Sequence, residues 1–147
     1  MAARRKKSKK QSDASLQLEE ELTFFIDRSL GHKLLAQSLL DNDEKVIVHD
    51  DLFAQDTIDE VWLEEAGKKN WIVLTHDTKI RYRKSETDAL LAHDVRAFVL
   101  TAKKLTGKEI AGVIVKALPR IKKLISKTPA PFIAHITRSG DVKIKPK

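Results

Sequence analysis

Aspartates stand just beyond three short apolar runs of this sequence, a position from which they could do chemistry together. In chain order they are Asp27, Asp50 with Asp51, and Asp77. Carboxylates that converge repel one another, and a hard divalent cation such as Mg²⁺ or Mn²⁺ relieves that repulsion because it prefers oxygen ligands. An ion held in this way can orient water for attack on a phosphodiester and stabilise the charge that develops on phosphate oxygens. The acids therefore predict a metal-dependent phosphodiester hydrolase, provided that the fold brings them together.

The elements that would position these acids alternate along the chain. Apolar and β-branched runs predict strands over 22–26, 45–49, 71–75 and 95–100. Apolar residues at helical spacing predict helices over 30–40, from Thr57 onward, and over 85–93, where Ser85 and Asp88 form a capping pattern. Such alternation predicts an α/β sandwich with a mostly parallel sheet, whose ligands bind beyond the carboxyl ends of the strands.

Asp59 is expected to join the strand-end acids from the start of a helix. Thr57 and Glu60 have the spacing of a capping box, so a helix should begin here, with Glu60 engaged in the cap. With a strand order of 2-1-3-4, the connection from the second strand to the third passes over the first. This connection would place Asp59 above Asp27 and Asp77 on neighbouring strands.

The C-terminal third is basic and is expected to complete the fold. Residues 107–126 form a basic amphipathic pattern in which Pro119 predicts a break or a kink. The runs 131–136 and 142–144 flank a turn at 139–141, which predicts a terminal hairpin.

Each of these residues also has a purely structural interpretation. Asp27 and Asp77 could begin turns, Asp59 could only complement the helix dipole, and Asp50 and Asp51 could form a solvated turn. His49 and His76 could be hydrogen-bonded histidines at strand ends, and Trp62 and Trp71 are expected in the core. Arg81, Arg83 and Lys84 follow Asp77 closely, where phosphate contact and plain exposure are both open.

Charge is distributed unevenly along the chain. Residues 1–10 carry six basic residues and no acid, residues 101–147 carry a net +10, and residues 11–100 carry a net −9, which together give the overall +7. Residues 1–20 are too polar to offset the entropy of ordering, so they are expected to form a mobile basic tail before a folded domain at 21–147. Basic flanks favour polyanions through counterion release, although a solvated surface with a solubilising tail is the plainer alternative.

Composition excludes several classes of site. The chain has no cysteine, which rules out disulfides, thiolate metal sites and a cysteine nucleophile, and suits a reducing cytoplasm. No apolar run is long enough to span a bilayer, and the basic N-terminus does not have the pattern of a secretory signal. The sequence also shows no Ser-His-Asp arrangement and no glycine-rich phosphate loop.

Several motifs, taken in order, resemble the PIN-like domain family, in the branch related to VapC-type toxin ribonucleases. The matching segments are Phe24–Gly31, His49–Phe53, Thr57–Leu63, Trp71–Ile80 and Pro131–Ile136. The resemblance covers roughly residues 23–144. One departure is Ile58, where the family often has proline, and this should affect only the entry to the helix.

The resemblance implies a three-layer PIN-like sandwich and a magnesium- or manganese-dependent endoribonuclease. It implies catalytic and metal-binding roles for Asp27, Asp59 and Asp77, while Asp51 and Glu60 match positions with less certain metal roles, as does Asp50. RNA is the implied substrate, an antitoxin protein is a further candidate partner, and a homodimer is one option for the assembly.

Two other functions compete with the nuclease. One is a PIN-like module with an incompetent metal site that only holds RNA or a partner protein. The other is a receiver-like phosphoacceptor domain, which expects an acidic pair after the first strand, where this chain has Asp27 followed by Arg28. A cleavage assay with and without Mg²⁺ or Mn²⁺ separates the nuclease from the binding module.

Overall fold

A six-stranded sheet forms the middle of the molecule in a computed structural model that describes residues 22–30, 33–77 and 83–144. The strand order is β2-β1-β3-β4-β5-β6, with β1 to β5 parallel and β6 antiparallel to β5. The strands are β1 (Thr23–Ile26), β2 (Lys45–Val48), β3 (Ile72–Thr75), β4 (Arg96–Leu100), β5 (Phe132–Ile136) and β6 (Val142–Ile144). The expected α/β class, the mostly parallel sheet, the order 2-1-3-4 and the terminal hairpin are all confirmed.

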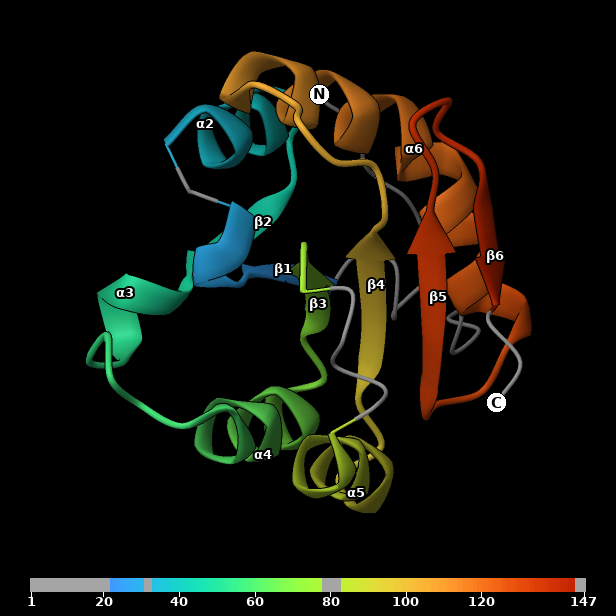
Figure 1. Ribbon diagram of the computed structural model, residues 1–147. Coiled ribbons are helices and arrows are strands. Elements are labelled where there is room, and N and C mark those ends of the chain that lie inside the picture. The colour runs from blue at the N-terminus through green and yellow to red at the C-terminus, as the bar shows by residue number, and fades with distance from the viewer. Residues whose placement is uncertain (1–21, 31–32, 78–82, 145–147) are drawn as a thin grey trace.

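Helices cover both faces of this sheet, so the molecule has three layers (Figure 1). They are η1 (Arg28–Leu30, a 3₁₀ turn), α2 (Lys33–Asp41), α3 (His49–Leu52), α4 (Asp59–Lys69), α5 (Lys84–Ala92) and α6 (Gly107–Lys127). The helices α2 and α6 pack side by side on one face, and α4 and α5 pack side by side on the other. None of the helices in the described ranges is both long and apolar enough to cross a membrane.

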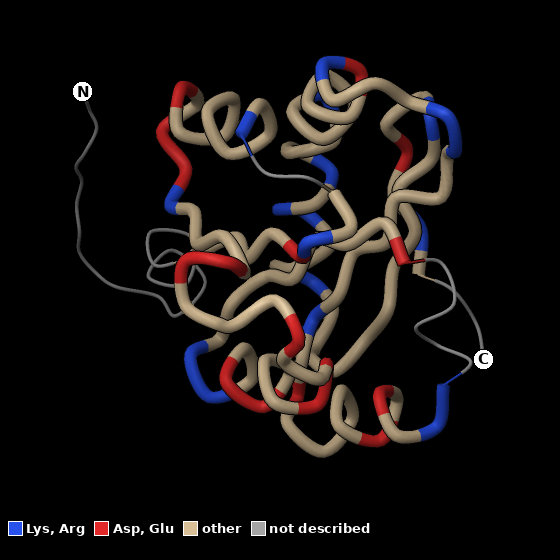
Figure 2. The backbone as a smooth tube through the Cα atoms, turned by 60° about the vertical axis from the view of Figure 1, so that its left-hand side comes forward, with Lys and Arg blue, Asp and Glu red and all other residues tan. Residues whose placement is uncertain are grey.

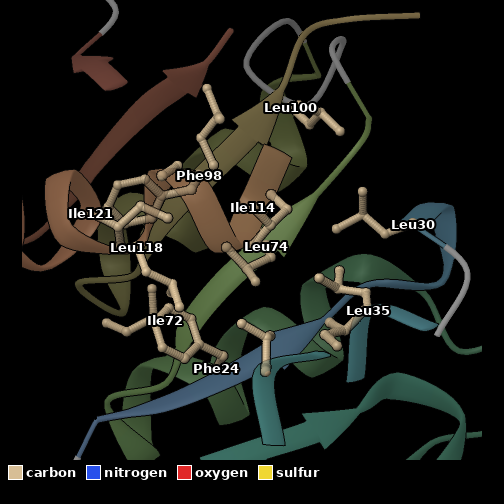
Figure 3. Packing of buried hydrophobic residues seen from close by; sticks show 14 of the residues in the cluster. Phe24, Leu30, Leu35, Ile72, Leu74, Phe98, Leu100, Ile114, Leu118 and Ile121 are labelled. Atoms are coloured by element: carbon tan, nitrogen blue, oxygen red, sulfur yellow. The ribbon is translucent and has the colours of Figure 1, made fainter. Parts of the chain in front are cut away.

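The side chains of alternate strand residues point to opposite faces of the sheet, where they pack into two separate hydrophobic cores. Phe24 and Ile26 of β1 join the larger core under α2 and α6, whereas Phe25 between them joins the smaller core under α4 and α5. Figure 3 shows the larger core, in which side chains of β1 and β3 meet Ile114 and Leu118 of α6. Helices cover both faces of the sheet, so the side chains on both sides of the central strands are buried. The sequences of these strands are therefore continuously apolar and do not alternate between apolar and polar residues.

The register brings the carboxyl ends of the central strands to one edge. Ile26 of β1 lies beside Val48 of β2 and Leu74 of β3, so β1 and β2 end level and β3 runs one residue further. The backbone N–H of Asp27 continues the pairing by donating to the carbonyl of Leu74 at 3.0 Å. The residues that follow these strands therefore share one edge of the sheet.

The prediction that Thr57 and Glu60 form a capping box at the start of α4 is wrong. The helix begins at Asp59, its N-cap residue is Ile58, and no side chain caps it. The backbone N–H of Thr57 instead donates to the carbonyl of Ala54 in a preceding turn, at 3.0 Å. Thr57 lies one residue too early to cap the helix, which leaves Glu60 without the capping role that its spacing suggested.

The second capping pattern is wrong for a similar reason. The helix α5 begins at Lys84 with Arg83 as its N-cap, two residues before the expected cap at Ser85. Asp88 pairs with Lys84 at 3.1 Å along the helix instead of closing a box.

A complete capping box occurs at the start of α6, where it was not expected. Glu109 N–H donates to Thr106 Oγ1 at 3.1 Å, and Thr106 N–H donates to Glu109 Oε1 at 2.8 Å. Pro119 lies inside α6 and does not break it, because the helix is continuous over Gly107–Lys127. The second strand ends at Val48, one residue earlier than expected, because the chain turns into the short helix α3 at His49.

Candidate metal centre

Three acidic side chains converge at the carboxyl edge of the sheet. Asp59 is the first residue of α4, Asp77 follows β3, and Glu86 lies in the first turn of α5. Each is half-buried and offers one carboxylate oxygen, and these three oxygens lie within 4.8 Å of one another. Two helix N-termini therefore direct acids toward the end of a central strand, where the helix dipoles also favour negative charge.

A buried tryptophan fixes the position of Asp59. The indole Nε1–H of Trp62 donates to Asp59 Oδ1 at 2.9 Å. Trp62 is buried in the smaller core, where its ring stacks on Phe25 with the ring centroids 5.2 Å apart. The core of the fold thus sets the orientation of this carboxylate.

Arg83 adds a positive charge to the group. Its Nη1 donates to Asp77 Oδ2 at 2.5 Å and to Glu86 Oε1 at 3.1 Å. These two hydrogen bonds, the one to Asp77 first, raise the pKa of Arg83 above its usual range. Burial raises the pKa of Glu86, and the charge of Asp59 raises it further, while Arg83 acts in the opposite direction.

Asp27 is tied to the turn that carries Asp77 through the hydroxyls of two residues. Its Oδ2 accepts hydrogen bonds from Thr75 Oγ1 at 2.7 Å and from Ser29 Oγ at 2.8 Å. The same Thr75 oxygen accepts from the backbone N–H of Asp77 at 3.0 Å, and Ser29 Oγ accepts from that of His76 at 2.9 Å. Asp27 is therefore placed to hold the turn that carries Asp77, and it is not a member of the group of three among the described residues.

The other predicted acids lie outside the group of three. Asp51 is exposed on α3, and Glu60 is half-buried next to Asp59. Asp50 accepts a hydrogen bond from the buried His49 at 2.8 Å, and Arg28 lies 3.7 Å away. The hydrogen bond from His49 is the main cause that lowers the pKa of Asp50, so this carboxylate is engaged in local structure.

Two further predictions concern histidine and the basic residues after Asp77. His76 bonds through Nε2 to the carbonyl of Ala102 at 2.6 Å, as expected of a structural histidine at a strand end. Arg83 contacts carboxylates, as described above. Arg81 lies outside the described residues.

Glu86 is the residue that the sequence interpretation missed. It occupies the first turn of α5, the helix that leads into β4, just as Asp59 occupies the first turn of α4, the helix that leads into β3. This equivalence was the available signal. The spacing of Ser85 and Asp88 accounts for this turn as a local capping pattern and gives Glu86 no role of its own.

A family model described as a PIN-like domain matches residues 22–102, more than half of the 147 residues. The chain belongs to the PIN-like domain family. Members of this family are generally nucleases that use a divalent metal. The matched range contains Asp27, Asp59, Asp77 and Glu86, and it ends before α6. No curated protein and no solved structure matches the chain.

The donor set of this PIN-like domain fits a hard divalent cation. Asp59, Asp77 and Glu86 present only carboxylate oxygens, the ligands that Mg²⁺ and Mn²⁺ prefer. Their spacing allows one ion to contact all three, with water completing the coordination.

Proposed function

We propose that this PIN-like domain is a Mg²⁺- or Mn²⁺-dependent endoribonuclease. The observation that carries the proposal is the convergence of Asp59, Asp77 and Glu86 at the carboxyl edge of the sheet in a chain of this family. The three carboxylates would hold the ion, which when bound activates water and stabilises charge on the phosphate. Asp27 would fix the turn at Asp77 through the hydroxyls of Ser29 and Thr75, and its role as a metal ligand stays a prediction.

Basic residues at the same edge support a nucleic acid as the substrate. The loop between β4 and α6 carries the exposed Lys103 and Lys104, and Arg138 donates to the carbonyl of Lys103 at 3.1 Å. The bond from His76 to the carbonyl of Ala102 joins this loop to the turn that bears Asp77. A phosphate backbone could therefore run from the basic loop to the acidic group.

The sequence suggested that the C-terminal helix and the N-terminal tail hold the RNA. The helix α6 starts near this edge and runs toward the opposite one, since β5 starts from the other edge after α6 ends. We therefore assign the main role to the loop at 102–105 and a smaller one to the distal half of α6. A role as the toxin of a toxin–antitoxin pair rests on the resemblance to VapC-type toxins alone.

The alternative, a PIN-like module that binds without cleaving, is favoured by one observation. Arg83 already neutralises part of the acidic group, as a metal would. The two functions differ in whether RNA is cut when Mg²⁺ or Mn²⁺ is supplied.

The experiment that tests the proposal is cleavage of single-stranded RNA by the purified chain in Mg²⁺, in Mn²⁺ and in EDTA. Asp77→Asn and Glu86→Gln should abolish the metal-dependent cleavage. Asp88→Asn is the matched control, because Asp88 lies on the same helix and pairs with Lys84 instead. Cleavage that persists in EDTA, or that survives both substitutions, would refute the metal site, and a lack of cleavage by the wild type would favour the binding module.

A further inference from the structure

Arg83 occupies an unusual position for a cation in a metal-binding group. It is the N-cap residue of α5, the same helix that carries Glu86 three residues later. Through one nitrogen, Nη1, it contacts two of the three carboxylates that would bind the metal, those of Asp77 and Glu86. The guanidinium and a divalent ion would therefore use the same side chains.

The charges explain why a cation is needed there. Asp59, Asp77 and Glu86 would carry three negative charges within a few ångströms if all were ionised. Such a group is self-repulsive, and repulsion of this kind favours protonation or spreading of the carboxylates. Arg83 supplies one positive charge at hydrogen-bond distance, so it can hold the group together without metal.

The same contacts oppose the metal. A divalent ion bound to Asp77 and Glu86 would lie close to the Arg83 guanidinium, and like charges repel. The side chain of Arg83 is 45% exposed, so it can move into water at small cost, because an ion pair near the surface contributes little net stability.

We propose that Arg83 is an internal counter-cation, which stabilises the metal-free acidic group and is displaced when Mg²⁺ or Mn²⁺ binds. Because these ion pairs must break before metal binds, they lower the affinity of the domain for metal. The affinity falls by the free energy that the ion pairs contribute to the metal-free state. This inference rests on the proposed metal site and adds a competing group within the chain itself.

The test compares Mn²⁺ affinity and metal-free stability in three full-length proteins. They are the wild type, Arg83→Gln and Lys84→Gln, the last being a matched loss of one positive charge from the next residue, whose partner Asp88 lies outside the group. Titration calorimetry measures the dissociation constant for Mn²⁺, and thermal melting in EDTA measures stability without metal.

Arg83→Gln should bind Mn²⁺ up to about fivefold more tightly than the wild type, the upper range for loss of an ion pair near the surface. It should also melt at a lower temperature in EDTA, and saturating Mn²⁺ should raise its melting temperature more than that of the wild type. Lys84→Gln should change the affinity by less than about twofold, because its charge is further away and more screened.

Each other outcome overturns the proposal in a recognisable way. If the wild type binds Mn²⁺ and Arg83→Gln binds it equally or more weakly, Arg83 does not compete with the ion, while the metal site itself stands. An equal gain in Lys84→Gln would show that only net charge matters. If neither the wild type nor Arg83→Gln binds Mn²⁺, the metal site fails, and the proposal for Arg83 fails with it.

Discussion

The hydroxyl of Thr75 is the smallest group on which the candidate site depends. It is buried, donates to Asp27 and accepts from the backbone N–H of Asp77. Thr75→Val keeps the shape of the side chain but removes a hydrogen-bond donor to the buried Asp27 and the acceptor for the backbone N–H of Asp77. We expect the free energy of unfolding to fall by about 1–3 kcal/mol, and metal-dependent cleavage to fall with it, as measured by urea denaturation and RNA cleavage.

Thr101→Val provides the matched control for this change. Thr101 also stands at the end of a strand, but its hydroxyl donates only to the carbonyl of Ile136, at 3.2 Å. We expect this variant to lose little stability and no activity. Equal cleavage by both variants would mean that the hydroxyl beneath Asp77 has no role in the site.

Asp59 and Glu60 are neighbours in sequence, yet only Asp59 belongs to the acidic group. Successive helical residues point about 100° apart, so the two cannot face one ion equally well. Asp59→Asn should lower the cleavage rate by on the order of a hundredfold or more, as expected for a lost electrostatic contact to a reacting centre. Its amide oxygen can still accept from Trp62, so stability should change by less than about 1 kcal/mol.

Glu60→Gln should keep most of the activity, since Glu60 neither joins the group nor caps the helix. Cleavage rates and thermal melting of the two variants, measured side by side, decide the assignment. If Glu60→Gln is inactive and Asp59→Asn remains active, then α4 is rotated and Glu60 faces the metal.

At the scale of elements, the strands could be predicted from sequence but the helix starts could not. Apolar runs mark buried strands, and the rules of connection between parallel strands give their order. A helix start depends on which backbone groups nearby turns satisfy, and Thr57 was already engaged with Ala54 through its backbone. The local patterns therefore misplaced the caps of α4 and α5 by one and two residues, and nothing in them set Glu86 apart from the other acids of the chain.

Asp27 shows the same limit within the site. Its position at a strand end was predictable, because the run before it is apolar and ends abruptly. Its partner Thr75 lies 48 residues away in sequence, and the hydrogen bond between them depends on the register of β1 against β3. Sequence alone could bring the acids to one edge, but it could not distinguish an acid in the group from one that is tied through Thr75 to the turn beside it.

The spacing between α4 and α5 depends on a single glycine. A Cβ at Gly67 would lie 2.1 Å from the carbonyl oxygen of His93, so alanine there must push the two helices apart. Because these helices carry Asp59 and Glu86, Gly67→Ala should weaken Mn²⁺ binding as well as lower the free energy of unfolding, by roughly 1–3 kcal/mol or more. Chemical denaturation and metal titration measure the two effects.

Gly112 in α6 is the control, since a Cβ there meets nothing within 4 Å. Gly112→Ala should instead stabilise the protein by about 0.5–1 kcal/mol, because alanine favours a helix interior over glycine. A tolerated Gly67→Ala would show that the packing of α4 on α5 is looser than the structure has it.

The capping box of α6 predicts a pH dependence at the same scale. The hydrogen bond from the backbone of Thr106 lowers the pKa of Glu109 below its ordinary value of 4.5. A carboxylate whose pKa is lower in the folded state stabilises the protein above the unfolded pKa, and this contribution is lost as the pH falls through the folded pKa. The melting temperature of wild type should therefore exceed that of Glu109→Gln at pH 7, and the difference should shrink below about pH 4.5. A difference that stays constant down to pH 3 would contradict the cap.

At the scale of the whole molecule, charge separates across the sheet. The helices α3, α4 and α5 together carry eight acidic and three basic residues, whereas α6 carries one acidic and six basic residues. Figure 2 shows the acidic positions gathered mainly around the helices that bear the site. A polyanion is repelled from that side, so it should approach over the carboxyl ends of β4 and β5, where the loop at 102–105 is basic.

If RNA approaches by this route, two pairs of lysines with the same total charge should contribute differently to RNA binding. Lys103 and Lys104 lie in that loop, beside the site, and Lys123 and Lys127 lie near the far end of α6. Binding of single-stranded RNA, measured in an Asp77→Asn background so that no cleavage occurs, should weaken in Lys103→Gln/Lys104→Gln. The slope of log affinity against log salt should become shallower by about 1.4, since each phosphate contact to a single strand contributes about 0.7.

The distal pair, Lys123→Gln/Lys127→Gln, removes the same two charges and should leave the slope nearly unchanged. Equal losses in the two double variants would mean that RNA responds only to net charge and follows no fixed path. A larger loss in the distal pair would place the RNA along α6, as the sequence alone suggested. In that case the strand would have to reach the acidic group by crossing the face of α6, and the bond between His76 and the loop carbonyl of Ala102 would be structural only.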